Sequence, residues 1–236
     1  MTATSLITPA TGSRRGRPPL PRQAIVYPES DGQPMADNTR QFEYIVMIQG
    51  GLAALFADRP DVFVAGDLLW YPVEGQPHIR AAPDAMVVFG RPPGHRGSYL
   101  QHEEDHIAPQ VVFEVLSPGN TPAEMRKKRG FYDRYGVEEY YEYDPDRGTL
   151  KGWRRRDGRL EPIDRMEGWV SPLLGIQFSL EGSDLALYHP DGQRFETFVE
   201  QARRVKAERQ RAEVAQQRAE RLAERLRQLG VDPDAL

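Results

Sequence analysis

Short continuous apolar runs, separated by turn residues, predict most of the strands in this chain. Runs of this kind are typical of strands that are covered on both faces, as in a sheet packed between helices. Two of the later runs are close enough in sequence to pair as a hairpin. The first predicted strand covers residues 62–65 and 68–71, with a break at Gly66-Asp67. The others cover residues 85–89, 111–116, 139–143, 150–155, 160–163, 176–180 and 185–188.

A helix is predicted from Asn38 to about Ala57. Asn38 is a suitable N-cap, and Gln41 follows three residues later, as in a capping box. Gly50 and Gly51 lie within this helix, where glycine costs stability, so we expect a neighbouring element to approach closely there. The face expected to pack inward consists of Phe42, Ile45, Val46, Ala53 and Phe56.

A second helix is predicted between Thr121 and Tyr135. Thr121 and Glu124 have the spacing of a capping box, and Pro122 occupies the first helical position. Gly136 supplies the left-handed residue that commonly ends a helix. The order of elements is a helix, three strands, a helix, a strand and a strand-rich remainder, which predicts an α/β fold with a mixed sheet flanked by helices.

The N-terminal part of the chain differs in composition from the central part, which we place at residues 35–190. Residues 1–34 are rich in Pro, Gly, Ser, Thr and Arg and have no apolar period, so we expect a disordered basic tail. Within it, Arg15-Gly16-Arg17-Pro18 resembles an AT-hook, which lays arginines into the minor groove of A·T-rich DNA. A tail that is merely solvated would have the same composition.

Residues 195–230 are dominated by Ala, Glu, Gln and Arg and predict one long helix. Its heptad pattern is that of a weak coiled coil, because Gln201 and Glu208 interrupt the second apolar row. We therefore expect either a homodimer formed through this helix or a solvated single helix. The first row consists of Phe198, Val205, Ala212, Ala219 and Leu226, and the second row ends with Ala215, Leu222 and Leu229.

Composition limits the class of protein. The chain has 236 residues, 39% of them apolar, which is enough for one globular domain with appendages. A net charge of −4 indicates no general affinity for nucleic acid, so any such surface must be local. The absence of cysteine excludes disulfides and thiolate metal sites. No stretch has the pattern of a signal peptide or membrane span, so we expect a cytoplasmic protein without membrane contact.

Two acidic residues stand in or beside apolar strands. Asp84 follows Pro83 at the head of one run, and Glu114 lies within Val-Val-Phe-Glu-Val-Leu. Burial of a carboxylate is costly unless a cation or several donors compensate for it. A salt bridge to a nearby arginine would be sufficient for either acid alone. Two acids near the ends of adjacent strands favour a divalent metal such as Mg²⁺, which prefers oxygen ligands.

Lys128 falls near the middle of the face that the second helix should bury. A buried ammonium needs an anionic partner, and the acids of the preceding strands are the natural ones; alternatively, the lysine packs only its stem. An Asp, a Glu and a Lys around a metal fit metal-assisted hydrolysis of a phosphodiester bond. His102 and His106 have the spacing of a helical metal pair, but residues 90–109 predict a polar loop near the active face.

Together these residues resemble the Uma-type family of putative restriction endonucleases, within the PD-(D/E)xK nuclease superfamily. The resemblance covers about residues 35–190 and implies a restriction-endonuclease-like fold, a Mg²⁺-dependent nuclease site and DNA as substrate. Asp84 matches the aspartate of the motif and Glu114 its second acid. The matching segments are Pro83-Asp84, residues 113–118 (Phe-Glu-Val-Leu-Ser-Pro), Lys128 with Tyr132, and residues 136–145 (Gly-Val-Glu-Glu-Tyr-Tyr-Glu-Tyr-Asp-Pro).

One position departs from the superfamily pattern. The lysine usually lies two residues after the second acid, where this chain has Leu116. The resemblance places it on the following helix at Lys128, with Lys127 as the fallback. Asp67, at the break in the first predicted strand, is a candidate third metal ligand, although a turn aspartate explains it equally well.

The leading prediction is therefore a Mg²⁺-dependent endonuclease that cleaves DNA with Asp84, Glu114 and Lys128. The alternative is a protein that keeps the nuclease fold and binds DNA or a partner without turnover.

Overall fold

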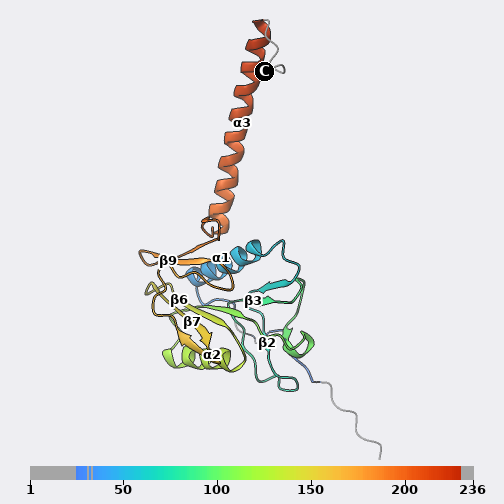
Figure 1. Cartoon of the computed structure of the whole chain (residues 1–236), viewed down its shortest axis with the longest axis vertical. Helices are drawn as coiled ribbons and strands as arrows, with labels where there is room; N and C mark the ends of the chain where they lie inside the picture. Colours follow the sequence, from blue (N-terminus) through green and yellow to red (C-terminus); the bar gives the residue numbers. More distant parts are fainter. Residues whose placement is uncertain (1–24, 31, 33, 230–236) are drawn as a thin grey trace, which may run out of the picture.

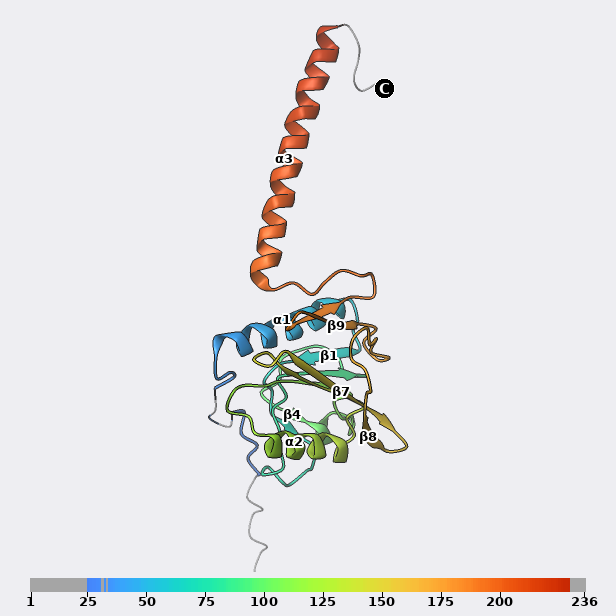
Figure 2. The ribbon, with the colours of Figure 1, turned by 90° about the vertical axis from the view of Figure 1, so that its left-hand side faces the viewer.

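The structure is a computed structural model that describes residues 25–30, 32 and 34–229. The AT-hook-like segment lies outside the described residues. A six-stranded sheet lies between two helices, α1 (Thr39–Leu55) and α2 (Pro122–Arg134), as Figure 1 and Figure 2 show. The predicted mixed α/β fold is confirmed.

The main sheet has the strand order β1-β3-β5-β6-β7-β8. β5 and β6 run parallel and are joined by α2, because parallel neighbours need a crossover connection. The other neighbouring pairs of this sheet are antiparallel. The strands are β1 (Val62–Ala65), β3 (Ala85–Phe89), β5 (Val111–Val115), β6 (Glu139–Asp144), β7 (Thr149–Arg156) and β8 (Arg159–Pro162).

Two smaller sheets complete the folded part. β2 (Trp70–Tyr71) pairs in parallel with β4 (Tyr99–Leu100), whereas β9 (Gln177–Glu181) and β10 (Asp184–Tyr188) form an antiparallel hairpin. The strand predicted over residues 68–71 is therefore shorter than expected.

The segment 90–109 is more ordered than the predicted polar loop, since it contains β4 and a 3₁₀ turn. Glu104 accepts hydrogen bonds from the guanidinium groups of Arg91 at 2.7 Å and Arg96 at 2.6 Å. Arg96 also lies over the Phe63 ring at 3.9 Å, which ties the segment to β1. This half-buried ion-pair cluster, rather than an apolar period, orders the segment.

The main sheet separates two apolar cores, because side chains alternate between its faces. On the α1 face, Phe113 and Tyr141 pack with Ile48 and with the β9–β10 hairpin. On the α2 face, Val112 and Tyr140 belong to the same core as Tyr132 of α2. Glu114 lies between Phe113 and Val115 in β5, so it projects to the α2 face.

The predicted inward face of α1 is partly wrong. Ile45 is buried and Phe56 half-buried as expected, but Phe42, Val46 and Ala53 are exposed. The buried residues are instead Gln41, Ile45, Met47, Ile48 and Leu52. The side of α1 that carries Gln41 faces the sheet, where the side-chain amide of Gln41 donates a hydrogen bond to the Val115 carbonyl at 2.7 Å.

The close approach predicted at the glycine pair is confirmed at one of the two positions. A Cβ built on Gly51 would stand 2.1 Å from the ring of Phe195, whereas one on Gly50 would meet nothing within 4 Å. The segment that follows β10 therefore crosses α1 at Gly51.

A long helix, α3 (Phe198–Gln228), projects away from the folded part in Figure 1 and buries none of its residues. Its 31 residues correspond to about 46 Å. Thr197 and Glu200 form a capping box at its start. Within the described residues, no helix is both long enough and apolar enough to cross a membrane.

Candidate active site

Asp84 lies immediately before β3, and its carboxylate connects that strand to β5. Register pairing of the two strands includes Ala85 with Phe113. Beyond that pair, Oδ2 of Asp84 accepts a hydrogen bond from the Val115 amide at 2.6 Å. The side chain therefore holds the two strands together at the end where Glu114 lies.

Glu114 is only 3% exposed and has partners on α2 for both of its carboxylate oxygens. Lys128 Nζ lies 2.7 Å from Oε2, and the hydroxyl of Tyr132 donates to Oε1. Lys128 and Tyr132 are four residues apart, so they share one side of the helix. The structure thus brings Lys128 to Glu114, as predicted, while Lys127 is exposed to solvent.

Lys128 remains an ammonium in this environment. Burial lowers its pKa, but the carboxylates of Glu114, Asp84 and Glu124 together more than offset this effect, so the pKa of Lys128 lies above its ordinary value. A lysine that stays protonated donates hydrogen bonds and neutralises negative charge; it does not act as a general base.

In contrast to Lys128, the environment of Asp84 favours the uncharged form of the side chain. Burial and the nearby charge of Glu114 raise the pKa of Asp84 well above its ordinary value, although the Val115 amide and Lys128 act against this shift. Two acids that share one lysine retain an excess of negative charge when both are ionised. A cation with oxygen preference would balance that charge.

Asp67 approaches the same region from the turn after β1. Its amide donates to the Pro83 carbonyl at 3.0 Å, and its charge contributes to the raised pKa of Asp84. Its φ of 48° is in the left-handed region, which aspartate tolerates in turns. The structure therefore supports the interpretation of Asp67 as a turn residue, while its role as a ligand stays a prediction.

The donor chemistry of Asp84 and Glu114 fits Mg²⁺, which prefers carboxylate oxygens and commonly uses only one or two of them. Across the described part of the chain, no three or more His, Cys, Asp or Glu residues are arranged to hold a metal ion. The three-acid set with Asp67 is therefore not assembled here, and the histidines of the 90–109 segment form no such group. A metal site formed by Asp84 and Glu114 alone stays a prediction.

Gln41 joins the site through a contact that sequence reasoning missed. Its Nε2 donates to the Val115 carbonyl, and its Oε1 accepts from the Asp37 amide at 2.8 Å. In a capping box this side chain would instead bond to the amide of Asn38. The sequence feature that could have indicated this contact is the presence of a polar residue on the apolar side of α1.

Glu142 is the second missed residue. It is paired in register with Glu114 on the parallel neighbour, is buried, and accepts a hydrogen bond from the Tyr140 hydroxyl at 2.8 Å. Burial raises its pKa, and Glu114 adds to the shift. An acid within the run Tyr-Tyr-Glu-Tyr was the signal, but only the strand register places it beside Glu114.

Comparison with known proteins identifies the family of this chain. No curated protein matches this chain. A solved structure described as a putative nuclease belonging to DUF820, from Anabaena variabilis ATCC 29413, is 16% identical, with a TM-score of 0.42, and covers 57% of this chain and 72% of its own. Residues 33–188 match the Uma2 family, whose description is "putative restriction endonuclease". Because this match spans more than half of the sequence and includes the ion pair described above, the chain belongs to the Uma2 family of putative restriction endonucleases.

Proposed function

We propose that this protein is a Mg²⁺-dependent endonuclease that hydrolyses phosphodiester bonds of DNA. Membership of an endonuclease family supports hydrolysis of phosphodiester bonds. The single observation on which the residue assignment rests is the 2.7 Å contact between Lys128 and Glu114, next to the buried carboxyl group of Asp84. Asp84 and Glu114 would hold the metal.

A bound Mg²⁺ would polarise the scissile phosphate and lower the pKa of an attacking water molecule. Lys128, as an ammonium, would neutralise the charge that develops on the phosphate oxygens in the transition state. Tyr132 donates to Glu114 and thereby fixes the orientation of that carboxylate. Hydrolysis forms one bond from the water oxygen to phosphorus and breaks one bond from phosphorus to the leaving oxygen.

Cleavage of supercoiled plasmid DNA tests this proposal. We expect nicking or linearisation in Mg²⁺ and none in EDTA. Asp84→Ala and Glu114→Ala should abolish cleavage, whereas Lys127→Ala, which removes an exposed charge from the same helix, should retain it. If both acid variants cut as well as the wild type, the assignment is wrong.

One observation favours the alternative of a nuclease fold without turnover. Both oxygens of Glu114 already have donors, so this acid is satisfied without a metal. A protein of this kind would bind DNA with a steep dependence on salt and would show no cleavage with any divalent cation. The same plasmid assay, repeated with Mn²⁺, distinguishes the two candidates.

We also propose that α3 joins two copies of the chain into a homodimer. The support is its exposed heptad pattern, since a 31-residue helix without buried residues leaves its apolar row in water.

A further inference from the structure

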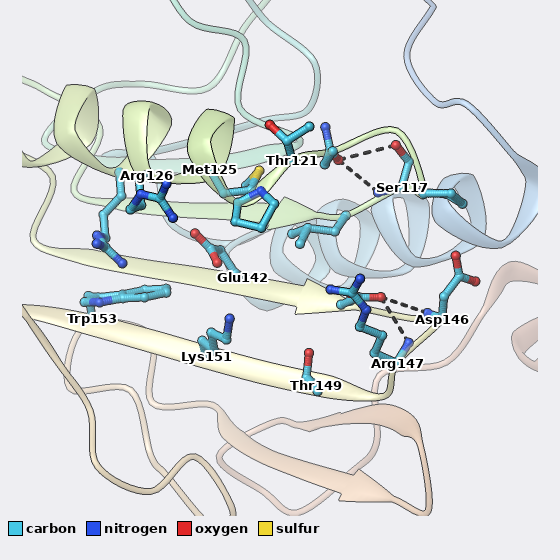
Figure 3. A pocket seen from close by; sticks show the side chains of 16 residues that line it. Ser117, Thr121, Met125, Arg126, Glu142, Asp146, Arg147, Thr149, Lys151 and Trp153 are labelled. Carbon is cyan, nitrogen blue, oxygen red and sulfur yellow. Dashed lines mark hydrogen bonds and ion pairs between the residues drawn. The ribbon is translucent and has the colours of Figure 1, made fainter.

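A pocket of about 480 Å³ lies between the N-terminal half of α2 and strands β6 and β7. Figure 3 shows Arg126 above this space, Glu142 within it, and the side chains of Lys151 and Trp153 along the lower strand. The pocket shares α2 with the candidate active site, because Arg129 directly follows Lys128 and also lines it. A volume of this size is within the range of small-ligand pockets, about 300–1,000 Å³.

Three cations enter this pocket from two elements. Arg126 and Arg129 belong to α2, and Lys151 belongs to β7. Within the described residues, none of the three forms an ion pair within 4.0 Å. The fourth cation of the pocket differs, because Arg147 lies 3.7 Å from Asp144 in the β6–β7 turn. The three cations are therefore available to an external anion.

The charge of these elements contrasts with that of the whole protein. α2 contains five Lys or Arg residues and two acids, and β7 contains four Lys or Arg residues and no acid, although the chain has a net charge of −4. A local concentration of positive charge on an acidic protein points to a site for a polyanion rather than to a general need for solubility.

The pocket offers donors rather than an aromatic surface. The ring of Trp153 stacks on Tyr140 with centroids 5.2 Å apart, and the Arg129 guanidinium lies 4.8 Å from the Trp153 ring centroid. The Trp153 side chain is also buried, with 7% exposed, which argues against a base stacked on it. Guanidinium and ammonium groups bind phosphate oxygens instead.

The pocket lining also includes three acids, Glu142, Asp144 and Asp146. Two of them lie beside arginines, since Asp144 is 3.7 Å from Arg147 and Asp146 is 3.9 Å from Arg40. The environment of Glu142, the third acid, reduces its opposition to an anion. It is buried, it accepts a hydrogen bond from Tyr140, and it lies within electrostatic range of Lys151 and Arg129.

We propose that this pocket binds the phosphodiester backbone of the cleaved DNA strand beside the scissile phosphate. The inference rests on the proposed function for the identity of the strand. Arg126, Arg129 and Lys151 would contact one or two phosphates there. The strand would run beside α2, between Lys128 and these three cations. Sequence-independent contacts of this type set affinity and register but do not read bases.

Binding of a short fluorescent single-stranded oligonucleotide, measured by anisotropy over a range of salt in EDTA, tests the inference. The full chain carries Asp84→Asn throughout, so that no cleavage can occur. The test variants are Arg126→Ala, Lys151→Ala and the double variant. The controls are Lys127→Ala on α2 and Arg159→Ala on β8, which remove charges that do not line the pocket. Far-UV circular dichroism and melting verify that every variant is folded.

Each pocket substitution should weaken binding and reduce the slope of log K against log salt by about 0.7, as expected for one lost phosphate contact to a single strand. The controls should keep the slope. Equal slopes in pocket and control variants would overturn the inference, as would binding of inorganic phosphate or a mononucleotide that the strand fails to displace.

Failure of the proposed function would look different. If wild-type protein cleaves nothing but the slopes still fall only in the pocket variants, the strand-binding pocket holds and the nuclease proposal fails. If cleavage is observed and the slopes do not change, the nuclease proposal holds and the strand-binding pocket fails.

Discussion

A buried carboxyl group beside a second acid favours its protonated form, and Asp84 is in this position. Its pKa is higher in the folded than in the unfolded protein, so between these two values the folded state binds more protons. Stability then falls as pH rises through that interval. Without metal, Asp84 therefore lowers the stability of the folded protein at neutral pH.

Asp84→Asn should consequently raise the melting temperature in EDTA at neutral pH, because the amide oxygen can still accept from the Val115 amide while the charge is removed. Each kcal/mol gained corresponds to roughly 2–4 °C for a chain of this size. The gain should shrink at acidic pH, where the wild-type carboxyl group is protonated. Thermal melting over this pH range checks the expectation; a lower melting temperature for Asp84→Asn at neutral pH would contradict it.

The same variant also separates metal binding from folding. Mg²⁺ should raise the melting temperature of wild-type protein, since a ligand that binds only the folded state stabilises it. Asp84→Asn should lose most of this response.

Lys128 can be tested by two substitutions that differ in charge. Lys128→Met leaves the Glu114 carboxylate without its cation and should lower the free energy of unfolding by about 1–3 kcal/mol. Lys128→Arg keeps the charge and should stay within about 1 kcal/mol of wild type. Cleavage by Lys128→Met should fall by about 10²–10³-fold, the usual effect of removing one transition-state donor.

Urea denaturation and plasmid cleavage provide the two measurements for Lys128. Wild-type cleavage by Lys128→Met would remove this residue from the proposed site, whatever its effect on stability.

At the element scale, the two adjacent glycines of α1 make opposite predictions. Gly50→Ala should stabilise the protein by about 0.5–1 kcal/mol, because it has free space and alanine is the better helix former. Gly51→Ala should destabilise it by about 1–3 kcal/mol, because its methyl group would overlap the buried ring of Phe195. Urea unfolding of the pair of variants is the measurement, and equal effects would show that Phe195 can move aside.

Elements with local signals could be predicted from the sequence. β3 matches its predicted bounds. α2 begins directly after its N-cap Thr121 and ends shortly before Gly136, because its capping box and left-handed glycine are encoded within a few residues. The buried face of α1 could not be predicted equally well. Its rotation depends on Gln41 reaching Val115, which lies 74 residues away in sequence.

The candidate site shows the same division. Asp84, Glu114 and Lys128 could be selected because charged residues in apolar elements are unusual, and the structure brings Lys128 to Glu114. Glu142 could not be placed beside Glu114 from the sequence, because that proximity depends on the register of two parallel strands. The pocket cations likewise converge only after α2 folds over β7.

At the scale of the whole molecule, α3 predicts a concentration-dependent homodimer. Removing residues 196–236 should convert a dimer into a monomer while leaving the unfolding of the remaining core within about 1 kcal/mol, because α3 buries none of its residues there. Light scattering coupled to size exclusion measures the mass. A full-length chain that stays monomeric at high concentration would refute the dimer.

Two point variants locate the contact more finely. Leu222→Glu places a charge in the apolar row of the heptad and should weaken the dimer, whereas Val214→Glu places the same charge outside both rows. Both side chains are exposed in the single chain, so neither change should alter the core. Similar dissociation by both variants would exclude the proposed coiled-coil register.

The hydrogen bond from the Val115 amide to Asp84 gives the protein a built-in reporter. The chemical shifts of a backbone N–H that donates to an ionisable oxygen change when that oxygen gains a proton or a cation. In an ¹⁵N correlation spectrum, the Val115 cross-peak should therefore move with acid titration and with added Mg²⁺. One resonance of the strand end would then reveal the charge state of the neighbouring carboxyl group, even in a preparation that contains no nucleic acid.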